Sequence, residues 1–422
     1  MAVYGELAWR GLIHGETEGV RDLLGRETVT TYAGFDPTAA SLHVGHLLPI
    51  LTLARFQRFG HVPIALVGGG TGLIGDPSFK TAERALLTVE QVEANVEGIR
   101  RQLARFLDFE SATAPARLLN NAEWLTKLGA IEFMRDVGKH FTVNAMVARE
   151  SVKRRMESDE GISYTEFSYP LLQSYDFLVL YDRFNCTLQI GGSDQWGNIT
   201  AGMDLIRRLR GQKAYGLVLP LLMTAAGAKF GKTEAGSVWL DPALTRPYEF
   251  YQFWINTDDR DATKYLNFFT YFSQERITEL DAIAAREPEK RHAQREVARE
   301  VTRLVHGDGG VREAEAATEA LFGGDVSGMS VADLLRVFPN MPSKTVPFHP
   351  DGWRVQTLLT EGGLTKSLGD ATRLIRSGSV SVNGRAFTDE FRRLSVADAI
   401  EGQLFLLRKG KKEYLLIHVD GP

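Results

Sequence analysis

Hydrophobic and polar residues follow two different periods in the first half of the chain. Short, nearly continuous apolar runs, typical of buried strands, occur at residues 29–35, 61–67, 118–120, 186–190 and 217–223. Apolar residues recur at helical spacing over residues 42–59, 89–107, 142–155, 164–181 and 196–209. This alternation predicts an α/β fold with a parallel sheet, right-handed crossovers and helices on both faces. Ligands of such sheets bind beyond the carboxyl ends of the strands.

The pattern changes after a first predicted domain, which comprises residues 1–247. Residues 248–322 are predicted to be helical, and residues 323–350 contain three glycines and four prolines, which indicates a linker. Residues 351–422 form a small further unit, in which Asn383-Gly384 predicts the tight turn of a β-hairpin. The chain is therefore expected to have three domains and one linker.

The composition excludes several classes of protein. The 422 residues include 49 Lys+Arg and 53 Asp+Glu, a net charge of −4, so any contact with nucleic acid must depend on a local basic patch. The single cysteine, Cys186, excludes an internal disulfide and favours a reducing compartment. No apolar run approaches the roughly 18 residues that span a bilayer, and the N-terminus lacks the pattern of an export signal. We expect a cytoplasmic protein without a membrane partner.

The motif HVGH lies at the start of a predicted helix. His43 and His46 are three residues apart and therefore share the first turn, where a helix N-terminus with imidazoles is suited to phosphate oxygens. Gly45 lets a flat ring lie against the helix backbone. Two half-buried core histidines and a zinc pair are the alternatives, but no further zinc ligand is evident nearby. With Asp36-Pro37-Thr38 before it, the motif favours phosphate binding.

The glycine-rich segment GGGTGLIG follows a predicted strand. Gly70, Gly72 and Gly75 satisfy the pattern G-x-G-x-x-G, which is typical of dinucleotide-binding folds. However, Asp76-Pro77 follows where that motif requires a helix, and a carboxylate there would repel a pyrophosphate. We therefore interpret the segment as a tight loop that directs Asp76 into the site, where it suits a substrate ammonium group.

Two further segments carry polar side chains at positions suited to a ligand. Tyr169, Gln173 and Asp176 share one helix face amid apolar neighbours, either as part of a binding site or as a structural hydrogen-bond network. In QIGGSDQ, paired glycines at a strand end allow close backbone approach to a ligand, with Asp194 as a hydroxyl acceptor.

The segment KFGKT follows the last predicted strand in a loop rich in Ala and Gly. Lys229 and Lys232 are either solvated surface residues or mobile clamps that close over a polyphosphate. Lys80 and Arg84, after the glycine loop, would add to the same positive field. Together with the two histidines, these four cations would suit pyrophosphate as a leaving group.

Taken together, these motifs resemble a known family. HVGH and KFGKT resemble the HIGH and KMSKS motifs of class I aminoacyl-tRNA synthetases, with Phe230-Gly231 in place of Met-Ser. The strings YAGFDPT, GLIGDPS, TEFSY, QIGGSDQWGNITAG and KFGKTE are similar to the bacterial tyrosyl-tRNA synthetase family, over about residues 1–310. The last 72 residues resemble the S4 RNA-binding domain of that family. The resemblance implies a Rossmann-like, doubly wound catalytic domain in a homodimer, an α-helical anticodon-side domain and a small α+β S4-like domain.

The resemblance also assigns roles to residues, position by position. It implies tyrosine binding by Tyr32, Asp36, Asp76, Tyr169, Gln173, Asp176 and Gln195. It implies ATP binding by Gly34, His43, Gly45, His46, Gly192, Asp194, Leu221, Leu222 and Lys232. It implies catalysis by Thr38, His43, His46, Lys80, Arg84, Lys229, Lys232 and Thr233. ATP is then a substrate, and Mg²⁺ is expected to arrive with it, since no metal cage of side chains is evident.

The reaction implied is tyrosine activation by ATP followed by transfer to tRNA(Tyr), and the tRNA must meet local positive charge. Candidate RNA-binding residues are Arg149, Lys153, Arg207, Arg208, Lys366, Arg373, Arg408 and Lys409, with Arg154, Arg155 and Arg210 beside them. A solvated helix face is the alternative for each cluster. A tryptophanyl enzyme, a small-molecule adenylyltransferase and an RNA-binding protein with a decayed site are the competing hypotheses. Tyr32 with Asp176 and the S4-like tail argue against a tryptophanyl enzyme. An adenylyltransferase would not need a linker and an RNA-binding tail, and the intact histidines and lysines argue against a decayed site.

Overall fold

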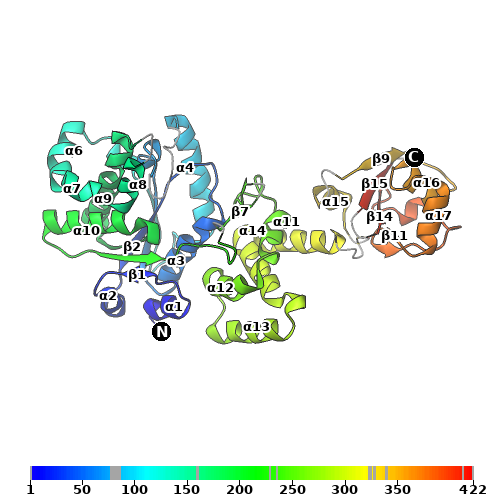
Figure 1. The fold of residues 1–422 in the computed structure, drawn as a ribbon, viewed down its shortest axis with the longest axis horizontal. Coiled ribbons are helices and arrows are strands. Elements are labelled where there is room, and N and C mark those ends of the chain that lie inside the picture. Colours follow the sequence, from blue (N-terminus) through cyan, green and yellow to red (C-terminus); the bar gives the residue numbers. More distant parts are fainter. Residues whose placement is uncertain are drawn as a thin grey trace. The chain divides into compact units, whose positions relative to one another are not determined.

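A computed structural model gives the fold of the chain (Figure 1). It describes residues 2–76, 87–157, 161–227, 230–233, 236–321, 326, 329–337, 341–410 and 413–420. The chain forms two compact units. The first comprises the residues up to Arg246 together with Phe253–Val305, and the second comprises Pro247–Gln252 with the residues from His306 onward. The predicted boundaries at 247, 322 and 350 remain a prediction.

The first unit contains a six-stranded sheet. Its strands are β1 (Gly15–Glu16), β2 (Thr30–Phe35), β3 (Val62–Val67), β4 (Arg117–Asn120), β5 (Cys186–Gly192) and β6 (Tyr215–Leu219). The spatial order is β1-β6-β5-β2-β3-β4, in which every pair is parallel except β1 with β6. The strand order therefore reverses between β2 and β5, which is where doubly wound sheets bind ligands.

Helices cover both faces of this sheet. The helices that precede β6 in the chain are α1 (Val3–Trp9), α2 (Val20–Arg26), α3 (Leu47–Arg58), α4 (Val89–Leu103), α5 (Ala122–Leu125), α6 (Ala130–Asp136), α7 (Val143–Val147), α8 (Glu150–Met156), α9 (Tyr164–Phe184) and α10 (Trp196–Arg210). Short 3₁₀ turns lie at η1 (Val44–His46), η2 (Thr71–Leu73), η3 (Gly138–His140) and η4 (Ser193–Gln195). In Figure 1, α3 and α4 lie on one side of the sheet and α9 and α10 on the other. Phe177 of α9, fully buried, packs against the Tyr32 ring at 5.2 Å between centroids.

Helices continue after the sheet. They are α11 (Pro247–Ile255), α12 (Asp259–Phe269), α13 (Gln274–Arg286) and α14 (His292–Leu321), with a 3₁₀ turn η5 (Pro288–Lys290) and a small hairpin of β7 (Lys232–Thr233) and β8 (Gly236–Ser237) before them. Gly307 interrupts α14 with φ 73° and ψ 179°, a conformation that favours glycine. The boundary between the two units falls at this kink, between Val305 and His306.

The second unit contains a five-stranded sheet in the order β12-β11-β14-β15-β9. Its strands are β9 (Ser343–Val346), β11 (Val380–Val382), β12 (Arg385–Ala386), β14 (Leu404–Lys409) and β15 (Glu413–Val419). Further elements are α15 (Val331–Val337), β10 (Trp353–Arg354), α16 (Val355–Glu361), α17 (Leu368–Arg376), β13 (Arg393–Leu394) and η6 (Val396–Asp398). Asn383 and Gly384 have positive φ values of 49° and 83°, and β11 pairs with β12 across them, so the predicted hairpin is confirmed.

The structure confirms the predicted α/β class and most predicted elements, but several of the predicted elements differ from the observed ones. The predicted helix at 142–155 is two helices, because Arg149 between α7 and α8 has an extended backbone. The predicted strand at 217–223 ends at Leu219, since Pro220 has no N–H for the sheet ladder. The predicted linker contains β9, which pairs in parallel with β15. Within the described residues, no helix combines the length and the apolarity that crossing a membrane requires.

Candidate active site

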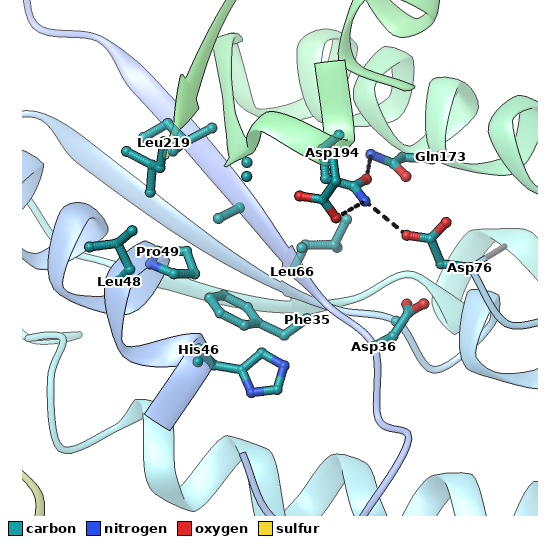
Figure 2. A pocket seen from close by; sticks show the side chains of 18 of the residues that line it. Phe35, Asp36, His46, Leu48, Pro49, Leu66, Asp76, Gln173, Asp194 and Leu219 are labelled. Carbon is teal, nitrogen blue, oxygen red and sulfur yellow. Dashed lines mark hydrogen bonds between the residues drawn. The ribbon is translucent and has the colours of Figure 1, made fainter. Parts of the chain in front are cut away.

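A pocket of about 400 Å³ opens at the carboxyl ends of β2 and β5, where the strand order reverses. Sixteen of the predicted site residues line it: Tyr32, Gly34, Asp36, Thr38, His43, Gly45, His46, Asp76, Tyr169, Gln173, Asp176, Gly192, Asp194, Gln195, Leu221 and Leu222. In Figure 2, Asp76, Gln173 and Asp194 lie toward one side of the pocket, whereas His46 and Pro49 lie toward the other. The motifs that the sequence places far apart thus meet in one pocket.

The remaining predicted residues belong to the two cationic loops. Lys80, Arg84 and Lys229 lie outside the described residues, as do the side chains of Lys232 and Thr233. The described part of KFGKT is anchored by Phe230, which lines the pocket and is 4% exposed.

The anchor is an aromatic cluster. The Phe230 ring stacks on Phe269 at 5.4 Å and meets Tyr265 edge-on at 5.1 Å between centroids. Gly231 follows with φ 81°, and a Cβ atom there would lie 2.8 Å from Cγ2 of Val44. Aromatic packing and close backbone approach therefore explain why phenylalanine and glycine occupy the middle of this motif.

One end of the pocket presents a buried phenol and a buried carboxyl group. Tyr32 on β2 is 1% exposed, and its hydroxyl makes no hydrogen bond with any described residue. Asp176 on α9 accepts a hydrogen bond from Nδ2 of Asn121 at 2.8 Å and one from Nε1 of Trp124 at 2.7 Å. Burial raises the pKa of Asp176 to about 7 despite these two donors. This end has unused hydrogen-bonding capacity at the Tyr32 hydroxyl.

A hydrogen-bonded chain connects that end to the middle of the pocket. Asn121 donates from Nδ2 to the Thr71 hydroxyl at 3.0 Å, and Thr71 donates to Oδ1 of Asp36 at 2.8 Å. The Tyr169 hydroxyl donates to Oδ2 of Asp36 at 2.8 Å. Burial, followed by the charges of Asp36 and Asp76, holds the pKa of Tyr169 well above its usual value. Tyr169 therefore remains a neutral phenol with oxygen lone pairs.

A second set of hydrogen bonds is built around the side-chain amides of Gln173 and Gln195. Gln195 donates from Nε2 to Oδ2 of Asp76 at 2.9 Å and to Oδ2 of Asp194 at 3.3 Å (Figure 2). Gln173 donates from Nε2 to Oε1 of Gln195 at 3.3 Å. A Cβ atom at Gly192 would overlap Oδ1 of Asp194 in its present conformation, so glycine there lets this aspartate keep that conformation. The carboxylates and amides form an acidic surface suited to a cationic group.

The HVGH motif forms a 3₁₀ turn rather than the regular first turn of α3. Nδ1 of His43 accepts a hydrogen bond from the Gly45 N–H at 3.1 Å, and Nδ1 of His46 accepts one from the His43 N–H at 3.1 Å. The two rings are 4.0 Å apart. Because each Nδ1 is an acceptor, each neutral ring carries its proton on Nε2. The motif thus supplies two imidazole donors to the pocket that His43 and His46 line.

Sequence reasoning missed several residues of the site. Asn121 and Thr71 connect the two carboxyl groups, Trp124 holds Asp176, and Gln189 lines the pocket on β5 in register with Tyr32. The position of Asn121 at the carboxyl end of β4 was an available signal. Trp124 gave no signal, because an apolar residue in a short helix is ordinarily core.

The predicted RNA-binding residues are distributed over both units. The prediction is wrong for Arg155, which the sequence placed beside these candidates. Its side chain is 2% exposed and donates to Glu166 at 2.8 Å, so this buried pair is not accessible to RNA. Arg149 is half-buried, and burial lowers its pKa, whereas Lys153 is exposed. Both Arg207 and Arg208 form ion pairs with Asp204.

In the second unit, the remaining candidates have varied surroundings. Lys366 is exposed, and Arg373 lies 3.5 Å from Asp370. Arg408 donates to the Ser381 hydroxyl at 3.1 Å, and Lys409 pairs with Glu413 at 2.8 Å. These contacts use only part of the donor capacity of each side chain. Across the described ranges of both units, no group of three or more His, Cys, Asp or Glu side chains is placed to hold a metal ion.

Comparisons with known proteins agree over the whole chain. Residues 25–323 match the family described as tRNA synthetases class I (W and Y), and residues 333–417 match the tyrosine–tRNA ligase SYY-like C-terminal domain. The tyrosine–tRNA ligase of Roseiflexus castenholzii is 57% identical over 420 residues, 99% of each chain. That of Geobacillus stearothermophilus is 52% identical over 422 residues, again 99% of each chain.

Solved structures show the same fold. A C-terminally truncated mitochondrial tyrosyl-tRNA synthetase from Coccidioides posadasii has a TM-score of 0.66 and 33% identity, covering 74% of this chain and 91% of its own. A tryptophanyl-tRNA synthetase from Encephalitozoon cuniculi has a TM-score of 0.52 and 15% identity, covering 73% of this chain and 86% of its own, and this likeness shows the fold alone. The chain therefore belongs to the class I tRNA synthetase family of the tryptophan and tyrosine enzymes.

Proposed function

We propose that the chain is a tyrosine–tRNA ligase that works through this pocket. The carboxylate of L-tyrosine attacks the α-phosphate of ATP and releases pyrophosphate, and the tyrosyl group is then transferred to the 3′ end of tRNA(Tyr). The observation that carries the substrate assignment is the buried end of the pocket. There the Tyr32 hydroxyl, which has no hydrogen-bond partner among the described residues, lies in the field of the Asp176 carboxyl group. A substrate phenol would donate to Asp176 and accept from Tyr32, which phenylalanine cannot do.

The middle of the pocket is assigned to the charged groups of the amino acid. An ammonium group would bind among Asp76, the Tyr169 oxygen and the Gln173 amide oxygen, which are all acceptors lining the pocket. Gln195 is assigned to the adjoining substrate carboxylate, to which one N–H of its Nε2 would donate in place of Asp194. Asp36 supports this arrangement, because it accepts the Tyr169 proton.

ATP is assigned to the side of the pocket that contains the HVGH turn. Thr38 and the two histidines would bind phosphate oxygens through O–H and N–H donors. Gly34 and Gly192 would allow backbone approach to the nucleotide, Asp194 would accept a ribose hydroxyl, and Leu221 with Leu222 would pack on the adenine. No side chain acts as a nucleophile, so orientation and electrostatic stabilisation supply the catalysis.

The cationic loops complete the assignment of the catalytic residues. Lys80, Arg84, Lys229, Lys232 and Thr233 would bind the pyrophosphate as negative charge develops on it, which the resemblance of their motifs supports. Mg²⁺ would arrive bound to the ATP phosphates. We place this reaction in the cytoplasm, in agreement with the single buried cysteine.

A second copy of the chain is proposed to cover an apolar surface of α6–α9. Five large hydrophobic side chains there are more than half exposed: Ile131 (77%), Met134 (52%), Val143 (64%), Met156 (51%) and Tyr164 (71%). A contiguous exposed apolar patch is typical of an interface, and we propose that these five side chains form one. Sedimentation is expected to show a dimer that Tyr164→Asp dissociates. The control Phe391→Asp, at an 87% exposed ring in the other unit, should leave the dimer intact.

The tRNA is proposed to contact Lys366, Arg373, Arg408 and Lys409 of the second unit, together with Arg149, Lys153, Arg207 and Arg208 of the first. These side chains carry the local positive charge that a chain of net charge −4 requires. The function is tested by charging a tRNA(Tyr) transcript with labelled tyrosine, phenylalanine or tryptophan. Charging with tyrosine alone is expected, and charging with tryptophan or with none of the three would contradict the proposal.

A further inference from the structure

Behind the two carboxamides of the pocket lies a third amide, that of Asn198. It is in the first turn of α10, is 7% exposed and is not among the residues that line the pocket. Its Nδ2 donates to Oε1 of Gln173 and to Oε1 of Gln195, at 3.1 Å in both cases. One buried NH₂ group therefore binds the oxygen ends of both glutamine side chains.

This contact determines which way each glutamine amide faces. An amide has an oxygen that only accepts and an NH₂ group that only donates. If either glutamine were rotated by half a turn, its NH₂ group would oppose the NH₂ group of Asn198. For Gln195, the same rotation would also turn its oxygen toward Oδ2 of Asp76, the acceptor that its Nε2 now contacts at 2.9 Å. Both rotated states lose hydrogen bonds and gain repulsion.

The fixed orientation leaves one acceptor for the substrate. Oε1 of Gln195 accepts from both Asn198 and Gln173, whereas Oε1 of Gln173 accepts only from Asn198 among the described residues. A carbonyl oxygen has two lone pairs, so Gln173 keeps one for a further donor. Asp76 and Tyr169 line the same pocket. A cationic donor with three N–H groups fits these acceptors.

We propose that Asn198 is a positioning residue for recognition of the substrate ammonium group. It keeps the Gln173 oxygen, rather than its NH₂ group, available to that ammonium, and it holds the Gln195 NH₂ group on Asp76. The inference rests on the proposed function, since it takes the ligand to be an α-amino acid. Asn198 itself contacts no ligand, so its effect on binding passes through the two glutamines.

The test compares two ligands that differ only in the amino group. These are L-tyrosine and 3-(4-hydroxyphenyl)propionate, which has the phenol and carboxylate but no ammonium. Asn198→Leu keeps the size of the side chain and removes the donor, and calorimetry gives both Kd values. Loss of a charge-assisted hydrogen bond predicts tyrosine binding weaker by about tenfold or more, with the propionate weakened much less, through Gln195 alone. Thr200→Ala on the same helix is the matched control, since among the residues that the structure describes its hydroxyl donates to the Trp196 and Gly197 carbonyls alone.

The ratio of the two Kd values does not depend on how much of the variant is folded, so a destabilised Asn198→Leu still gives an answer. Equal weakening of both ligands, or an unchanged ratio, would overturn the role of Asn198. A double-mutant cycle with Gln173→Ala gives a second readout, because Asn198→Leu should cost less when Gln173 is absent. Additive effects would also overturn it. A wild-type protein that does not prefer tyrosine to the propionate would instead overturn the proposed function.

Discussion

Replacing Tyr32 by phenylalanine removes one buried oxygen atom, and it should change stability and affinity in opposite directions. The Tyr32 hydroxyl is buried and makes no hydrogen bond with the described residues of the free protein. A buried polar group without a partner costs about 1–3 kcal/mol, so the free energy of unfolding of Tyr32→Phe should rise by up to that amount. In the complex, the same hydroxyl is expected to donate to the substrate phenol. Losing that bond costs about 0.5–1.5 kcal/mol, which is about two- to twelvefold in the Kd for tyrosine.

Phenylalanine should respond in the other direction. In the wild-type protein it would deprive both Tyr32 and Asp176 of the hydrogen bond that a substrate phenol provides, whereas in Tyr32→Phe only Asp176 loses one; Asp176 keeps its hydrogen bonds from Asn121 and Trp124 in both proteins. Urea denaturation without ligand gives the stability, and equilibrium dialysis with both amino acids gives the discrimination. A variant that is less stable than the wild type and still rejects phenylalanine equally well would refute the reasoning about this hydroxyl.

Three other predictions concern the described part of the chain. Burial raises the pKa of Asp176 to about 7 from 3.8, so the folded protein holds a proton that the unfolded chain releases. The contribution of this group to stability therefore falls as the pH rises from about 4 to 7, and denaturation of Asp176→Asn at pH 5 and pH 8 should lack that difference. Phe230→Ala should lower the free energy of unfolding by about 3–5 kcal/mol, because it leaves a cavity in an aromatic cluster; a loss below about 1 kcal/mol would mean that the cluster is not packed. Glu166→Gln should destabilise the protein by about 3–5 kcal/mol by leaving Arg155 buried without its carboxylate, and an unchanged denaturation midpoint would contradict the buried pair.

The sequence predicts the parts of the site that follow from strand ends and local motifs. The carboxyl ends of parallel strands meet at one edge, so Asp76 and Asp194 were expected together, and both line the pocket. Tyr32 lies within β2, and only the family resemblance assigned it to the site. Tyr169, Gln173 and Asp176 share a helix face at spacings of four and three residues. Their common orientation was therefore predictable as well.

Contacts between segments far apart in the chain were not predictable in this way. Asn121 lies 55 residues before Asp176 and 50 after Thr71, and no local pattern pairs them. Arg155 belongs to a run of basic residues that is typical of a solvent-exposed helix face, yet its own side chain pairs with Glu166 on the next helix. The Leu219–Pro220 step shows the converse case. The end of β6 could have been predicted from local chemistry, since proline cannot extend the ladder, although the predicted strand ran on to residue 223.

Amino-acid-dependent exchange of labelled pyrophosphate into ATP, without tRNA, tests the central claim most directly. It isolates the activation step, and it compares tyrosine, phenylalanine and tryptophan in one pocket. The account predicts rapid exchange with tyrosine and little with the other two, with the preference for tyrosine over phenylalanine reduced in Tyr32→Phe. Exchange with tryptophan, or no exchange with any of the three, would contradict it.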